Sequence, residues 1–191
     1  MIIWVTGTPG VGKTATGKTL AKRLGIDFID LPELVSTYSL YEERMDDGTM
    51  VVETRRLARH LQKQVRGDTV IAGHIPVRVR GHENRCIVLR LNPLQLRKRL
   101  EERGYSAEKV AENVEAEFLG VIYLDAMRVF GKKHVTQIDV TGKELGEVVD
   151  LCIEAVERGN AGEDVEWMSR LDESSLSELL RHLSSAKKGK L

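Results

Sequence analysis

The chain has 191 residues, and its 29 lysines and arginines balance 29 aspartates and glutamates, so the formal net charge is zero. This length allows one domain, or one domain with an appendage, and the balanced charge excludes the strong overall field of many nucleic-acid and membrane binders. The two cysteines, Cys86 and Cys152, lie in apolar segments, which indicates buried reduced thiols instead of a disulfide framework or a metal site.

A glycine-rich loop follows the first predicted strand. Residues 2–5 are apolar and mostly β-branched, as expected of a buried strand, and residues 15–24 carry leucines at helical spacing. Between them, residues 7–14 read Gly-Thr-Pro-Gly-Val-Gly-Lys-Thr, a complete G-x-x-x-x-G-K-[ST] motif. Strand, loop and helix in this order are the context in which the motif binds phosphate. It therefore predicts a nucleoside-triphosphate site, and the alternative is a chance match in a strand-to-helix turn.

The residue types of this motif suit the binding of phosphate. Glycines let successive backbone N–H groups point inward, and the N-terminus of the following helix adds partial positive charge. We expect the phosphates of ATP to bind Gly10, Val11, Gly12, Lys13 and Thr14. Lys13 is expected to reach the β- and γ-phosphates, and the Thr14 hydroxyl is the expected protein ligand of Mg²⁺.

The rest of the chain alternates between predicted strands and helices. Further strands are expected at residues 27–30, 69–72, 86–89 and 135–140. Helices are expected at residues 54–66, 93–102, 106–130 and 141–158. The sequence therefore predicts an α/β fold, with a five-stranded parallel sheet and helices on both of its faces, the pattern of a P-loop kinase.

Several local features are expected within this pattern. Residues 31–35 and 40–44 could be helical, and the acidic residues 46–48 are expected to form a turn. A Ser or Thr followed three residues later by Glu predicts a capping box at the start of a helix. Two such pairs occur late in the chain, Thr141 with Glu144 and Ser175 with Glu178.

The residues after 158 differ in character from the rest. Residues 159–162 read Gly-Asn-Ala-Gly, which predicts a linker, and an apolar segment that includes Trp167 follows it. We expect residues 159–191 to form a small helical extension packed on the core. The alternative is a partner-binding arm, because Trp167 and the leucines that follow exceed what a solvated tail requires.

No apolar run approaches the ~20 residues of a membrane-spanning helix. The predicted strand that begins at residue 2 leaves no room for a signal peptide. We therefore expect a soluble cytoplasmic protein that makes no contact with a membrane.

Phosphoryl transfer also needs cations near the transferred group and segments that exclude water. Arg97, Arg99 and Arg103 lie in or directly after the helix expected at residues 93–102. We expect Arg97 to be a solvated charge paired with an acidic neighbour, whereas the role of Arg99 stays open. Arg103 abuts Gly104, where a hinge is expected, so we expect it to act on the nucleotide.

A histidine follows the third predicted strand. Residues 70–74 read Val-Ile-Ala-Gly-His, with Ala72 where a carboxylate that positions Mg²⁺ would be expected. Asp30 or Glu33 could replace that carboxylate through water. Open α/β sheets bind ligands at the ends of their strands, where a neutral His74 could orient a water or accept a proton. Lys13, His74 and Arg103 are thus the catalytic candidates, and the alternative for His74 is an ordinary loop histidine.

Specificity for the phosphate acceptor is expected in residues 31–53. Candidate contacts there are Tyr41, Arg44, Asp46 and Asp47. They could equally form an ordinary polar loop. Arg78 and Arg80 could bind the acceptor phosphate, with a plain surface loop as the alternative.

Three segments of the chain resemble the adenylate-kinase-like ATPases of small-subunit ribosome biogenesis, the family of the human coilin-interacting nuclear ATPase and its archaeal relatives. These segments are the motif at residues 7–14, Gly73-His74, and Arg99-Leu100-Glu101-Glu102-Arg103-Gly104-Tyr105-Ser106 with Glu112-Asn113 downstream. The last segment is more selective than the first, which all P-loop kinases share. The similarity covers about residues 1–158.

The resemblance implies an adenylate-kinase core in residues 1–158, with a nucleotide-monophosphate region at 31–53 and a short lid at 103–113. His74 belongs by this match to the family's variant of the second nucleotide motif, in which eukaryotic members have an Asp in place of Ala72. The resemblance also implies broad-specificity adenylate kinase activity, in which ATP and AMP give two ADP, together with ATPase activity. It further implies a role in rRNA maturation on the pre-ribosomal particle, through a small-subunit ribosomal protein.

Two other functions stay open. One is an ATPase that uses its nucleotide state as a switch on a ribosomal-protein partner, favoured by the missing carboxylate and by the extension. The other is a kinase for a different small acceptor, such as a nucleoside or a coenzyme precursor.

Overall fold

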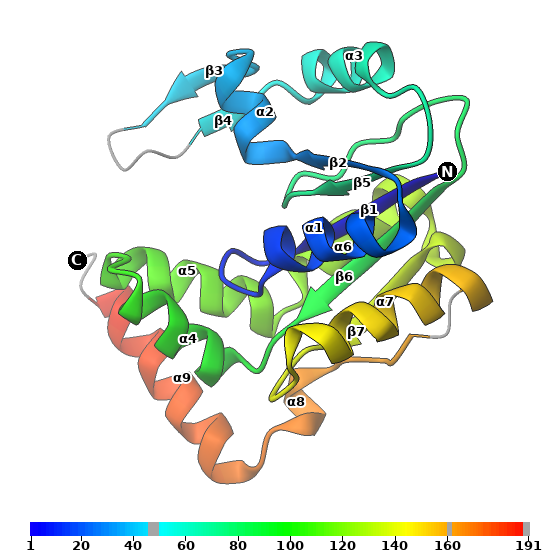
Figure 1. Cartoon of the computed structure of the whole chain (residues 1–191). Coiled ribbons are helices and arrows are strands. Elements are labelled where there is room, and N and C mark those ends of the chain that lie inside the picture. The colour runs from blue at the N-terminus through cyan, green and yellow to red at the C-terminus, as the bar shows by residue number, and fades with distance from the viewer. Residues whose placement is uncertain (46–49, 160–161, 189–191) are drawn as a thin grey trace.

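Five parallel strands form the centre of the structure, a computed structural model that describes residues 1–45, 50–159 and 162–188 (Figure 1). The strands are β1 (Ile2–Gly7), β2 (Asp27–Asp30), β5 (Thr69–Ala72), β6 (Asn84–Arg90) and β7 (Val135–Asp139). Their order across the sheet is β2-β5-β1-β6-β7, and neighbouring strands run parallel. The predicted α/β fold with a five-stranded parallel sheet is therefore confirmed.

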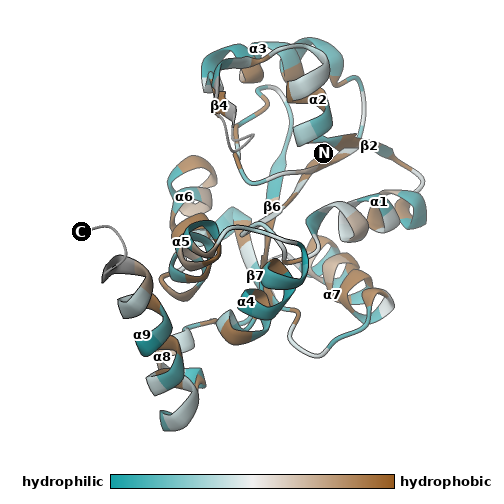
Figure 2. Ribbon diagram, turned by 90° about the vertical axis from the view of Figure 1, so that its left-hand side faces the viewer, coloured by the Kyte–Doolittle hydropathy of each residue, from teal (hydrophilic) through white to brown (hydrophobic). Residues whose placement is uncertain are grey.

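Helices cover both faces of the sheet, as expected. They are α1 (Lys13–Leu24), α2 (Leu31–Thr37), α3 (Thr54–Gln64), α4 (Pro93–Glu102), α5 (Ala107–Phe118), α6 (Val121–Phe130), α7 (Leu145–Arg158), α8 (Trp167–Arg170) and α9 (Glu173–Lys188), with a 3-10 turn at Lys132–His134. Buried residues of α1, α4, α5, α7 and α9 join one hydrophobic cluster, and those of α2, α3 and α6 join a second. Figure 2 shows α4 and α7 with hydrophobic residues on one side and hydrophilic residues on the other.

Strand β1 separates these two clusters. All six of its residues are buried, as are all four of β5, because a parallel sheet covered by helices hides both of its faces. Side chains alternate along a strand, so Ile3 and Val5 join the first cluster whereas Ile2 and Trp4 join the second. The apolar run at the start of the chain is thus the middle of the core.

The single helix expected at residues 106–130 is wrong, because the structure has two helices there. Leu119 is the C-cap of α5, and Gly120 adopts a left-handed conformation with φ of 67° at the N-cap of α6. Glycine carries no Cβ and adopts this conformation without strain, whereas other residues rarely do. The break lets α5 pack beside α4 while α6 lies against β6 and β7.

The helix considered for residues 40–44 is also wrong. Residues Tyr41–Arg44 form β3, which pairs antiparallel with β4 (Met50–Val52) in a separate two-stranded sheet. Pairing with a partner strand outweighs the weak local preference of this short segment. The acidic turn expected at residues 46–48 lies outside the described residues.

Both predicted capping boxes are wrong in position. Glu144 caps α7, and its partner in a reciprocal capping box is Glu147. The Thr141 hydroxyl instead accepts a hydrogen bond from the Asn92 backbone at 3.0 Å. Helix α9 begins at Glu173, before the predicted cap at Ser175. A Glu three residues after Ser or Thr therefore did not identify the start of either helix.

Both cysteines are buried and free, as expected. Burial raises the pKa of Cys152 to about 12 and that of Cys86 further still, so both thiols are protonated at neutral pH. Within the part of the chain that the structure describes, no helix is long and apolar enough to cross a membrane.

The C-terminal segment packs on the rest of the molecule. Glu163 donates a backbone hydrogen bond to the Gln137 carbonyl at 3.2 Å, which holds this segment along the outer strand β7. Helix α9 then lies beside α4 and α5 (Figure 1), where Leu179 and Leu183 join the first hydrophobic cluster.

We predict opposite effects for alanine at two glycines. Gly120→Ala should lower the free energy of unfolding by about 1–2 kcal/mol, because the left-handed backbone strains a residue with a Cβ. Gly146→Ala, in open space in α7, should leave it unchanged or raise it by up to ~1 kcal/mol. Urea unfolding gives the free energy of unfolding of both variants. An unchanged value for Gly120→Ala would contradict our account of the helix break.

Candidate functional site

The loop between β1 and α1 is bent by three glycines with positive φ. Gly7, Gly10 and Gly12 have φ values of 142°, 97° and 106°, which residues with side chains rarely adopt. A Cβ on Gly7 would lie 2.5 Å from the Leu89 carbonyl oxygen, so Gly7 also allows a close approach to β6. The glycines of the sequence motif therefore fix the path of the loop into the N-terminus of α1.

Lys13, the first residue of α1, lies in this loop. Its Nζ donates a hydrogen bond to the Thr8 carbonyl oxygen at 3.0 Å. Burial lowers the pKa of Lys13 to about 8. The negative charges of Glu117 and Asp30 oppose this shift, whereas the positive charge of Arg103 adds to it. Lys13 is still mostly protonated at pH 7, and it is close enough to Arg103 for the two cations to interact.

Asp30 supplies a carboxylate beside Thr14. The Thr14 hydroxyl donates to Asp30 Oδ2 at 2.9 Å, and Asp30 Oδ1 accepts from the Glu33 backbone N–H at 3.2 Å as the N-cap of α2. Asp30 on β2 lies directly opposite Ala72 on β5. The carboxylate missing from position 72 is thus present on the neighbouring strand, and Glu33 contributes its backbone instead of its side chain.

The oxygens of Thr14 and Asp30 are of the kind that Mg²⁺ prefers. Among the described residues, no group of three or more His, Cys, Asp or Glu side chains could hold a metal ion by itself.

His74 lies just beyond the end of β5. Surrounding protein atoms and the positive charges of Lys13 and Lys109 lower its pKa to about 4. The residue is also exposed to water, which screens these charges in part. His74 is therefore neutral at pH 7. A Cβ on Gly73 would lie 2.6 Å from Leu31, so this glycine lets the end of β5 approach α2 closely.

Arg103 is the exposed C-cap of α4, and Gly104 follows it in a left-handed conformation with φ of 74°. The positive charge of Arg103 contributes to the lowered pKa of Lys13. Arg97 pairs with Glu101 at 2.8 Å, as expected of an ordinary surface charge, and Arg99 is half-buried on the same helix.

Three residues near the site were missed by sequence reasoning. Glu117 of α5 accepts a hydrogen bond from the Thr8 hydroxyl at 2.5 Å and pairs with Arg90 at 2.7 Å, both in the interior. Lys109, at the start of α5, affects His74 through its charge. The sequence shows Glu117 within a predicted helix and Arg90 at the end of an apolar strand. Neither pattern reveals that the two side chains pair with each other.

Comparisons with known proteins agree with this geometry. A family model described as an AAA domain matches residues 3–120. A protein named "Putative adenylate kinase" from Thermococcus gammatolerans is 39% identical over 160 residues, which cover 83% of this chain and 87% of that protein. One of the same name from Methanocaldococcus jannaschii is 39% identical over 159 residues, which cover 82% and 86%. The chain belongs to this archaeal protein family.

Solved structures show how widely the fold of this family occurs. A gluconokinase from Sinorhizobium meliloti matches with a TM-score of 0.54 and 19% identity, over 82% of this chain and 91% of that one. A shikimate kinase from Bacteroides thetaiotaomicron matches with a TM-score of 0.54 and 17% identity, over 82% and 98%. At these identities the likeness concerns the fold alone.

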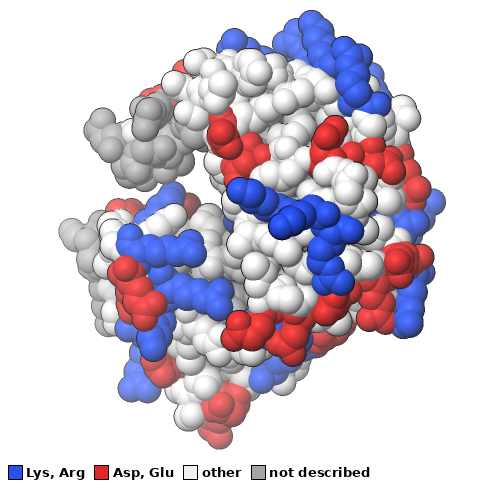
Figure 3. All heavy atoms as spheres, viewed as in Figure 1, with Lys and Arg blue, Asp and Glu red and all other residues white. Residues whose placement is uncertain are grey.

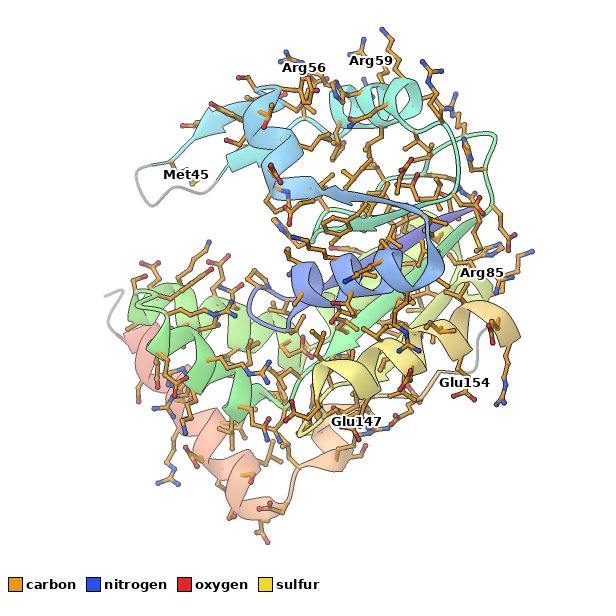
Figure 4. The ribbon with its side chains drawn as sticks, viewed as in Figure 1. Met45, Arg56, Arg59, Arg85, Glu147 and Glu154 are labelled. Atoms are coloured by element: carbon orange, nitrogen blue, oxygen red, sulfur yellow. The ribbon has the colours of Figure 1, made fainter. Side chains whose placement is uncertain are left out.

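The molecule is hollowed between α2, β3 and β4 on one side and α4 and α5 on the other, with Lys and Arg side chains on the lower side (Figure 3). Met45 borders this hollow from above, whereas Arg56 and Arg59 on α3 point away from it (Figure 4). Tyr41, one of the residues expected to contact the phosphate acceptor, is half-buried at the start of β3. The side chain of Arg44 and residues 46–47 lie outside the described part.

Arg78 and Arg80 are exposed on the segment between β5 and β6. The backbone N–H and carbonyl of Arg80 both bond to the side-chain amide of Gln62 on α3, at 2.8 and 2.9 Å. This pairing accounts for the position of the loop without any role for the arginine side chains.

We predict that one lysine of the protein titrates near pH 8. Burial of Lys13 is the cause, because it disfavours the charged form of the amine. NMR of the lysine side chains measures this; the signal should vanish in Lys13→Met and remain in a Lys18→Met control.

The lowered pKa of Lys13 also makes the free energy of unfolding depend on pH. Between about pH 8 and 10.5 the unfolded chain binds this proton more tightly than the folded protein does, so the contribution of Lys13 to folding stability rises with pH. A Lys13 midpoint near 10 would contradict the buried environment described above.

Proposed function

We propose that the protein is a broad-specificity adenylate kinase, which transfers the γ-phosphoryl group of ATP to AMP and also hydrolyses ATP. The observation that carries this proposal is the glycine-bent loop with the Lys13 amine at its base and Arg103 and His74 within electrostatic reach. The name of the archaeal relatives supports adenylate kinase as the reaction.

In this proposal the loop binds the phosphates of ATP. The backbone N–H groups of Gly10, Val11 and Gly12 would bind phosphate oxygens, and Lys13 would exchange its bond with the Thr8 carbonyl for one with the β- and γ-phosphates. Thr14 would be a ligand of Mg²⁺, with the Asp30 carboxylate fixing one of its waters. The ion would neutralise charge on the phosphates.

Arg103 and His74 would act on the transferred group. Arg103 would contact the nucleotide and stabilise the charge that develops on the γ-phosphoryl group, and Gly104 would let its segment move over the phosphates. His74, neutral at pH 7, could accept a hydrogen bond from the water that attacks in ATP hydrolysis and so orient it.

We further propose that residues 1–158 form the kinase domain, with 31–53 as the nucleotide-monophosphate region, 103–113 as a short lid and 159–191 as a helical extension. Support comes from the hollow between β3 and β4 on one side and α4 and α5 on the other, because the phosphate loop lies at its inner end (Figures 1 and 3). AMP would bind on the side of β3 and β4.

The cellular role proposed from the sequence resemblance is maturation of rRNA in the small ribosomal subunit. It would involve a small-subunit ribosomal protein and the pre-ribosomal particle in the cytoplasm. The resemblance of the segment around Arg103-Gly104-Tyr105 is its support.

A second candidate function is an ATPase switch with little kinase activity. The observation that favours it is the packing of Trp167, whose indole reaches Glu117 beside the phosphate loop at 3.0 Å. In that case the nucleotide would control how the C-terminal extension presents itself to a protein partner.

An assay of ADP formation separates these functions. We expect ATP with AMP to give ADP faster than ATP with CMP, GMP or water alone. Lys13→Ala should weaken ATP binding by about 10- to 150-fold, because it removes a charged hydrogen bond worth about 1.5–3 kcal/mol. Lys18→Ala, on the exposed side of the same helix, is the control. Absence of any stimulation by AMP would reject the adenylate kinase and leave the switch.

We also predict that His74→Ala and Arg103→Ala lower turnover by about 10²-fold or more while the free energy of unfolding changes by less than about 1 kcal/mol. Nucleotide binding should weaken less than turnover, because both groups are proposed to act mainly on the transition state. Lys98→Ala, exposed on α4, is the matched control. Steady-state kinetics and thermal unfolding test this, and an early-melting variant or near-normal turnover would assign that residue a structural role.

A further inference from the structure

The side chain of Glu117 on α5 is only 1% exposed, and that of its partner Arg90 on β6 is 3% exposed. Removing two charges from water is costly, and a buried ion pair is tolerated only when further hydrogen bonds surround both groups. The groups that form hydrogen bonds with this buried pair are therefore needed to keep it stable.

The two oxygens of the Glu117 carboxylate bind different parts of the chain. Oε2 accepts the Thr8 hydroxyl of the phosphate loop at 2.5 Å. Oε1 accepts Arg90 Nε at 2.7 Å, the Leu91 backbone N–H at 3.2 Å and the indole N–H of Trp167 at 3.0 Å. One carboxylate thus joins the phosphate loop to the C-terminal segment.

Arg90 holds the same C-terminal segment from the other side. Its Nη1 donates to the Val165 carbonyl at 3.1 Å, and its guanidinium lies 5.8 Å from the centre of the Trp167 ring. Trp167 is only 3% exposed. The C-terminal segment therefore completes the environment of the buried pair.

The contact at Thr8 leads directly to the cation of the loop. The hydroxyl of Thr8 is held by Glu117, and the carbonyl of Thr8 accepts Lys13 Nζ at 3.0 Å. The negative charge of Glu117 also favours the protonated form of Lys13 against the effect of burial. A change at Trp167 can thus reach Lys13 through two residues.

We propose that Glu117 is a positioning residue through which docking of Trp167 sets the shape of the phosphate loop and strengthens nucleotide binding. The proposal rests on nucleotide binding by this loop, as proposed above. Coupling between two sites is reciprocal, so nucleotide binding also tightens the docking of the C-terminal segment by the same factor.

A double-mutant cycle tests this coupling. Thr8→Val removes the hydroxyl that Glu117 holds, and Trp167→Phe removes the indole N–H but keeps a ring over Arg90. The affinity for Mg²⁺ and the β,γ-imido analogue of ATP is measured by calorimetry for both single variants and the double variant. Each single change should weaken binding by about fivefold or more, the lower range of allosteric coupling. The double variant should bind as weakly as Thr8→Val alone.

Met168→Ala is the matched control, because Met168 is 55% exposed beside Trp167. It should leave the affinity unchanged with either residue at position 8. Equal losses from Trp167→Phe in both backgrounds, or no loss in either, would overturn the proposal, because Trp167 would then act independently of Thr8.

A second measurement needs no nucleotide. Hydrogen exchange of the indole N–H groups, followed by NMR, reports Trp167 and the buried Trp4 separately. Thr8→Val should speed exchange at Trp167 by about fivefold and leave Trp4 unchanged. Unchanged exchange at Trp167 would overturn the coupling even if the protein binds nucleotide. If the wild-type protein fails to bind nucleotide while Trp167 responds, the coupling stands and the proposed function fails.

Discussion

A carboxylate removed from water needs hydrogen-bond donors around it, and the buried Arg90–Glu117 pair places this requirement on several separate segments of the chain. Helix α5 carries this carboxylate, and the phosphate loop, the end of strand β6 with Leu91 after it, and the segment around Trp167 each bring a donor to it. These elements are distant in the sequence. Their common attachment explains why an extension that follows the last strand of the sheet packs as part of the core instead of hanging from it.

The order of the strands has a similar effect on the opposite side of the loop. Strand β2 lies next to β5, so Asp30 stands across from Ala72 and beside Thr14. A carboxylate can therefore reach the end of α1 although the strand that would usually carry it ends in alanine. His74 lies beyond the same end of β5, where burial by protein atoms, and after it the charge of Lys13, lower its pKa and keep the imidazole neutral. The groups that meet at this end of the sheet therefore depend on which strands are neighbours.

Sequence reasoning was most successful where the signal is local. Apolar runs predicted β1, β5 and β6, because parallel strands under helices are buried on both faces, and the glycine motif predicted the loop. Sequence reasoning failed where the residues that interact lie far apart in the chain. Gly120 ends a helix only because its left-handed turn suits the packing of α5 and α6, and Glu117 matters because Thr8 and Arg90 meet it in space. The choice of Asp30 over Glu33 needed the strand order, which no local pattern contains.

The outermost strand on one side of the sheet, β7, is not left open. The backbone of Glu163 bonds to Gln137, and Gly162 lies so close that a Cβ there would meet the Thr136 side chain at 2.5 Å. An uncovered strand edge is a template on which other chains can add as further strands. A form of the protein shortened before this segment would present such an edge to its neighbours. The C-terminal segment therefore occupies part of the edge to which another chain would otherwise add as a strand.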